Sequence, residues 1–207
     1  MSEVFDAGRA QELVTQLENL YQKARAAVKT RVCEGDKVSA KLVEEHQMAA
    51  HAVAAMATEV EAARQMAAYG ESQNGELEQR LATAYLAQVA HHFLTDITLS
   101  QAEKISVKEI GLTSAELHEF AGNEAVKAYL AAGARTEDYK KIVDLIREKD
   151  GKAGAFAIND ETLEMIQDQF AKFSNDKVIP LAPEVHDQDK LIPIEIINEM
   201  AELGVFG

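Results

Sequence analysis

The sequence lacks tryptophan and has only three prolines, one cysteine and 6% aromatic residues. Because Cys33 stands alone, no disulfide can form within the chain, which fits a reducing compartment, and we expect a cytoplasmic protein. The scarcity of proline removes most interruptions to helices, and the abundant alanine, glutamate, leucine, lysine and glutamine favour them. Together these features predict an all-α protein.

Basic residues and long apolar runs are also scarce. The chain has 21 lysines and arginines against 35 aspartates and glutamates, a net charge of -14. That charge opposes binding to nucleic acid or to an anionic membrane surface. No apolar run approaches the length of a membrane span, and the acidic opening MSEVFDAGRA does not resemble a signal peptide. We expect neither nucleic acid nor membrane as a partner.

The first half of the chain carries three long stretches with helical spacing. They are expected at Ala7–Val32 with Asp6 as N-cap, from Ser39 to Tyr69 with Gly70 as the stop, and from Gly75 to about Lys104. Their apolar stripes step by three and four: Leu13, Leu17, Leu20, Ala24 and Val28; Val53, Met56, Val60, Ala63 and Ala67; Leu77, Leu81, Tyr85, Val89, Phe93 and Ile97. Long helices joined by short turns predict an antiparallel bundle.

The second half is more broken. Thr113, Asn123 and Thr136 are expected to cap three short helices that supply the fourth wall of the bundle. We therefore predict a bundle over residues 1–150, a linker over 151–158 and a separate segment over 159–207.

That last segment should hold two helices. Asn159 is expected to cap the first, Pro180 and Pro183 to force an extended crossing, and Pro193 to open the second, which Gly204 ends. Two helices in about fifty residues bury little apolar surface on their own, so this segment needs a partner surface.

No residue combination in the chain predicts a catalytic or metal site. A di-iron helical bundle needs Glu-x-x-His on two helices, and none of the histidines, such as His51 or His118, follows a glutamate at that spacing. Cys33 lies beside Glu34, and a neighbouring carboxylate disfavours the thiolate that a catalytic cysteine needs. We expect neither catalytic residues nor a metal within these residues.

The last segment resembles the N-terminal helical region of the flavin-dependent acyl-CoA dehydrogenases. Members of that family show a Phe-rich helix, then V-x-P-x-A, an acidic turn, a proline, and a helix ending in M-x-E-L-G-x-F-G. The matching residues are Phe170, Val178, Pro180, Ala182, Asp189, Pro193, Met200, Glu202, Leu203, Gly204, Phe206 and Gly207.

The opening bundle resembles the C-terminal domain of the same family. A helix there reads approximately F-Q-x-x-x-x-x-L-A-D-M-A-T-E-x-E-A-A-R, and the match consists of Gln47, Met56, Ala57, Thr58, Glu59, Glu61, Ala62, Ala63 and Arg64. The chain thus resembles a C-terminal-type bundle placed ahead of an N-terminal-type segment. One branch of the family carries such a helical extension ahead of its dehydrogenase core.

The family motif that helps to hold FAD is only partly kept in this chain. The family's R-x-x-F-G and a following glutamine correspond in order to Arg31, Gly35 and Gln47, but Glu34 replaces the phenylalanine and the spacing is longer. The family's H-G-G loop is also missing, since the matching region, 95–99, contains no glycine. The resemblance implies a bundle that kept its packing and lost the flavin site.

Two functions remain as hypotheses. The resemblance implies the N-terminal part of an FAD-dependent dehydrogenase that acts on an acyl-CoA and self-associates. FAD and the catalytic glutamate would then lie outside residues 1–207, which would be structural: they would extend the dimer or cover the substrate end of the core. The alternative is a standalone acidic helical module that presents an apolar groove to another protein.

Overall fold

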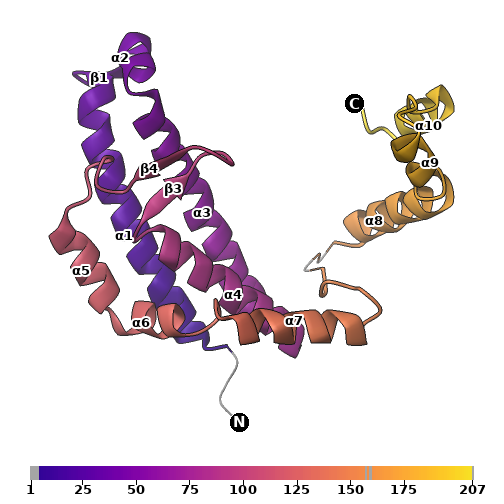
Figure 1. Ribbon diagram of the computed structural model, residues 1–207, viewed down its shortest axis with the longest axis horizontal. Coiled ribbons are helices and arrows are strands. Elements are labelled where there is room, and N and C mark those ends of the chain that lie inside the picture. Colours follow the sequence, from indigo (N-terminus) through magenta and orange to yellow (C-terminus); the bar gives the residue numbers. More distant parts are fainter. Residues whose placement is uncertain (1–4, 157, 159, 207) are drawn as a thin grey trace. The chain divides into compact units, whose positions relative to one another are not determined.

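The computed structural model describes residues 5–156, 158 and 160–206, and it divides into two compact units, Met1–Ala155 and Phe156–Gly207. The described residues are mostly helical, with two short hairpins as the sheet, so the all-α prediction is confirmed (Figure 1). Among these residues no helix is long and apolar enough to cross a membrane.

Three helices form the body of unit 1: α1 (Ala7–Val32), α3 (Gln47–Ser72) and α4 (Glu76–His92). Their side-chain contacts show alternating directions. Arg64 in α3 reaches Glu18 in α1 at 3.1 Å, and Glu59 in α3 reaches His92 in α4 at 3.2 Å. Gly70, farther along α3, meets Phe5 just before α1 and Ala82 in the first half of α4. The antiparallel arrangement predicted from the sequence is confirmed (Figure 1).

The first helix has the predicted bounds, and the second does not. The Asp6 carboxylate accepts a hydrogen bond from the Arg9 N–H at 2.9 Å and so caps α1. The stretch predicted from Ser39 is interrupted at His46, which separates the short α2 (Ala40–Glu45) from α3. Between α1 and α2, β1 (Cys33–Glu34) and β2 (Lys37–Val38) pair as an antiparallel hairpin.

Gly70 was expected to end its helix, and that prediction is wrong. It is buried within α3, and a Cβ built there would lie 2.6 Å from the Phe5 ring and 2.8 Å from the Ala82 Cβ. The position therefore needs glycine because α4 and the start of the chain approach it closely, and not because the helix stops.

The third long helix was predicted to reach about Lys104, but α4 ends at His92. A hairpin comes next, formed by β3 (Asp96–Thr98) and β4 (Lys104–Ser106), in which Ile97 pairs with Ile105. Phe93 and Ile97 are both buried, so they continue the spacing of the helix although the backbone has left it. Periodicity alone does not separate these two structures.

Three short helices cover α4 and α1: α5 (Ser114–Gly122), α6 (Glu124–Ala131) and α7 (Thr136–Glu148). Thr113 caps α5 as predicted, in a capping box with Glu116, and Asn123 accepts hydrogen bonds from the Ala125 and Val126 N–H groups. Thr136 begins α7 instead of capping it. The Asp138 carboxylate holds that turn by accepting from the N–H groups of Gly133 and Arg135.

Unit 2 contains α8 (Glu161–Phe173), the π-helical turn η1 (Ser174–Val178), α9 (Ala182–Asp187) and α10 (Ile194–Glu202). Asp160 caps α8 by accepting from the Thr162 and Leu163 N–H groups, whereas the expected cap, Asn159, lies outside the described residues. The predicted extended crossing is wrong, because Pro183 occupies the first turn of α9. Pro193 opens α10 as predicted.

Candidate functional site

Unit 2 contains an apolar groove. The groove has a volume of about 630 Å³ and runs between α8, η1, α9 and α10. Its walls are formed by Phe170, Phe173, Ser174, Lys177, Val178, Leu181, Ala182, Val185, His186, Ile192, Pro193, Ile196, Met200 and Val205.

The family motif and the groove coincide. Of the motif residues, Phe170, Val178, Ala182, Pro193 and Met200 line the groove. Two other motif residues, Asp189 (φ 51°) and Gly204 (φ 77°), lie in turns of unit 2. Both adopt the left-handed backbone conformation, which few residue types tolerate. Phe206 is exposed, and Gly207 lies outside the described residues.

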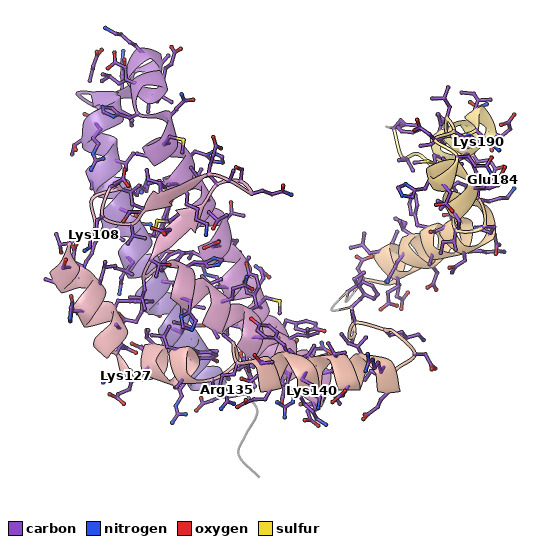
Figure 2. The ribbon with its side chains drawn as sticks, in the orientation of Figure 1. Lys108, Lys127, Arg135, Lys140, Glu184 and Lys190 are labelled. Carbon is purple, nitrogen blue, oxygen red and sulfur yellow. The ribbon has the colours of Figure 1, made fainter. Side chains whose placement is uncertain are left out.

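Two ion pairs join the elements of unit 2. Lys177 in η1 donates to the Glu199 carboxylate in α10 at 3.1 Å, and Lys190 pairs with Glu184 across the turn after α9 (Figure 2). The hydrogen bond from Lys190 lowers the pKa of the Glu184 carboxyl below its ordinary value. All four side chains are at least a third exposed, so these pairs fix geometry more than they add stability.

Taken by itself, the described part of unit 2 leaves the groove open. Within the described part of unit 2, Ile196 alone is a buried apolar residue, and Leu191 is 92% exposed. The large apolar side chains left exposed in unit 2 are Phe156, Leu163, Met165, Ile166, Phe170, Ile179, Leu181, Leu191, Ile192, Ile194, Ile197, Val205 and Phe206. Such a surface marks an interaction site or an unfinished domain.

The three positions matching the family's flavin motif are only partly brought together. Arg31 and Gln47 line one hollow of about 310 Å³ in unit 1, near the start of α3. Gly35 lies outside that lining, in the turn between β1 and β2, where its φ of 64° favours glycine. The Arg31 Nη1 donates to the backbone oxygen of Glu109 at 2.7 Å, so this side chain already holds the loop after β4.

The charges around this hollow do not fit a flavin dinucleotide. Glu45 and Glu109 line it together with Arg31, and the exposed Glu34 stands next to Gly35. A pyrophosphate bound there would lie close to these carboxylates, which would repel it. The volume is also at the lower limit of small-molecule pockets, which start at roughly 300 Å³.

The histidines do not assemble a metal centre. No group of three or more potential ligands occurs among the residues that the structure describes. His92 Nδ1 lies 3.2 Å from Glu59 across α3 and α4, and His118 Nδ1 contacts its own helix at the Ser114 oxygen.

One buried ionic cluster had no signal in the sequence. Glu78, in the first turn of α4, has a side chain only 5% exposed and contacts both Lys149 and the Ala155 N–H. Glutamate is common in the first turn of a helix, because its charge interacts favourably with the helix dipole. Nothing in the sequence therefore indicated that Glu78 is buried.

Comparison with known proteins links both units to one family. Residues 160–207 match the acyl-CoA dehydrogenase N-terminal domain. The chain is also 38% identical over 205 residues to a (2S)-methylsuccinyl-CoA dehydrogenase from Cereibacter sphaeroides, a match covering 96% of this chain and 36% of the relative. The chain thus spans about a third of that relative's length, and the similarity extends through unit 1. Both findings support membership of the acyl-CoA dehydrogenase family.

Proposed function

We propose that residues 1–207 form the N-terminal part of an FAD-dependent acyl-CoA dehydrogenase that oxidises the bond between the α and β carbons of an acyl-CoA. The relative named above supports a branched dicarboxylic acyl-CoA of the methylsuccinyl-CoA type as the substrate. In this proposal unit 2 begins the dehydrogenase body and unit 1 is an extension ahead of it.

The open groove of unit 2 is the observation that carries this proposal. The groove coincides with the residues that match the family's N-terminal domain, and unit 2 by itself leaves its apolar walls open. A domain that leaves so many large apolar side chains exposed needs a partner surface. Further chain after Gly207, as in the longer relative, would complete it.

Unit 1 has a structural role in this proposal. In contrast to unit 2, its large exposed apolar side chains are few: Val38, Met48, Tyr139 and Val143. It has a core of its own that includes Leu13, Met56 and Phe93. The carboxylates beside Arg31 argue that FAD is held elsewhere in the protein. Unit 1 would extend the dimer or cover the substrate end of the core, in a cytoplasmic homodimer.

A comparison of two lengths of the protein tests this function. The 207-residue chain should purify colourless and inactive. A protein that includes the residues encoded after Gly207 should carry flavin and reduce an electron acceptor with methylsuccinyl-CoA. A longer protein without flavin, or a 207-residue chain with stoichiometric flavin, would refute the proposal.

A variant in unit 1 tests the location of the flavin. Arg31→Ala with Gln47→Ala in the longer protein should leave the flavin content unchanged, because neither side chain would contact it. Loss of flavin from this double variant, with the fold intact by circular dichroism, would place the cofactor in unit 1.

The alternative function is a standalone interaction module, which the same groove favours because it would bind an amphipathic helix of another protein. The two functions differ in the residues that they require beyond Gly207. A β-rich domain encoded there supports the dehydrogenase, and a stop codon supports the module.

A further inference from the structure

The chain between α7 and unit 2 is attached to the body of unit 1. We call residues 149–155 the strap. The carboxylate oxygen Oε1 of Glu78 accepts hydrogen bonds from the Lys149 ammonium at 3.2 Å and from the Ala155 N–H at 3.0 Å. The Tyr69 hydroxyl, from the last turns of α3, donates to the Ala155 oxygen at 2.7 Å. The N–H group of Ala155 is thus bound by Glu78 in α4, and its backbone oxygen by Tyr69 in α3.

Glycines stand where the backbone comes close to the side chains of Tyr69 and Glu78. Gly154 in the strap has a φ of 108°, and a Cβ built there would lie 3.0 Å from the Tyr69 hydroxyl. Gly75, before α4, leaves room for the carboxylate, because a Cβ built there would lie 1.9 Å from Glu78 Oε2. Side chains at either position would displace the contacts between the strap and the helices.

The burial of Glu78 is otherwise unfavourable for unit 1. Taking a carboxylate out of water costs free energy unless hydrogen bonds compensate it. Burial raises the pKa of Glu78. Hydrogen bonds from its own N–H, from Lys149 and from the Ala155 N–H lower the pKa by more than burial raises it, so the pKa of Glu78 lies below its ordinary value. Apart from its own N–H, these compensating groups come from the strap. Packing between α4 and α7 uses apolar residues instead, such as Leu77 and Ile142.

We propose that Glu78 and Tyr69 form a clasp that holds residues 149–155 against unit 1 and thereby fixes the point at which the chain leaves this unit. Only residues 156–159 then separate the clasped strap from Asp160, the cap of α8. The chain would then enter unit 2 from a fixed point on unit 1, and not from the end of a long flexible linker. This inference depends on unit 1 alone, so it can fail while the proposed function stands.

Amide hydrogen exchange and limited proteolysis of the 207-residue chain test the clasp. Glu78→Ala should speed exchange of the Ala155 amide by about tenfold or more, because a buried hydrogen bond to a charged acceptor is lost. Tyr69→Phe removes a single oxygen, and we expect both variants to speed trypsin cleavage after Lys152. Glu76→Ala is the matched control, since Glu76 lies in the same helical turn and pairs with Arg80 instead of the strap.

Two results would overturn the clasp. One is an Ala155 amide that exchanges at the same rate in the wild type and in Glu78→Ala. The other is cleavage after Lys152 that is as rapid in the wild type as in Tyr69→Phe. Tyr69→Phe keeps the test decisive if Glu78→Ala disturbs the fold, which circular dichroism would detect.

Discussion

Phe206 offers a quantitative test of whether unit 2 is an unfinished domain. Its side chain is 61% exposed in this chain. A phenylalanine can bury roughly 150–250 Å². About 90–150 Å² of Phe206 would therefore become covered if further residues complete the domain, which at about 25 cal/mol per Å² is about 2–4 kcal/mol.

The expected consequence is that Phe206→Ala has different effects in two lengths of the protein. In the 207-residue chain it should change hydrogen exchange in α8 and α10 little. In the longer protein it should speed that exchange by roughly 30- to 1,000-fold, the ratio that corresponds to this free energy when exchange reports local opening.

Phe93→Ala is the control for this comparison. Phe93 is fully buried in unit 1, so its replacement should cost about 3–5 kcal/mol in both lengths, seen as faster exchange in α3 and α4. Equal effects of Phe206→Ala in the two lengths would refute the reasoning, because Phe206 would then stay uncovered in the longer protein.

Three further predictions concern single positions. Gly70→Ala should destabilise unit 1 in urea by up to about 2 kcal/mol, because overpacking exceeds the gain in helix propensity. Gly122→Ala, which meets no atom within 4 Å, should instead be neutral or stabilising in the same assay, and equal signs would contradict the close approach at Gly70. The stability that Glu78 contributes should be complete above its unfolded pKa of about 4.5 and should be lost as the pH falls through its lower folded pKa. Acid unfolding of the wild type and of Glu78→Gln should therefore follow different curves, and identical curves would contradict this prediction. Met200→Asp should cause aggregation of the longer protein while the α1–α4 exchange pattern persists, and equal loss in both units would argue against separate domains.

The sequence predicted features that depend on neighbours along the chain. The bounds of α1, the capping box at Thr113 and the opening of α10 at Pro193 follow from caps and spacing within a few residues. These signals act through local hydrogen bonds and backbone geometry, so they do not require knowledge of the tertiary fold.

Features that depend on distant contacts were missed. Gly70 continues a helix because Phe5 and Ala82 need its space, and nothing adjacent to it in the sequence encodes that requirement. The burial of Glu78 depends on Lys149 and Ala155, more than seventy residues away. At the candidate flavin positions, the resemblance identified Arg31 and Gln47, but only the fold shows which carboxylates accompany them.

The position of α4 has a consequence for synthesis on the ribosome. This helix contacts α3, which is made before it, and α6 and α7, which are made after it. Part of the surface of α4 is therefore covered only by later chain. A nascent chain that has released α1, α3 and α4 still exposes the surface that α6 and α7 will cover. Unit 1 therefore reaches its final stability only when residues up to about 155 have emerged, before unit 2 has left the ribosome.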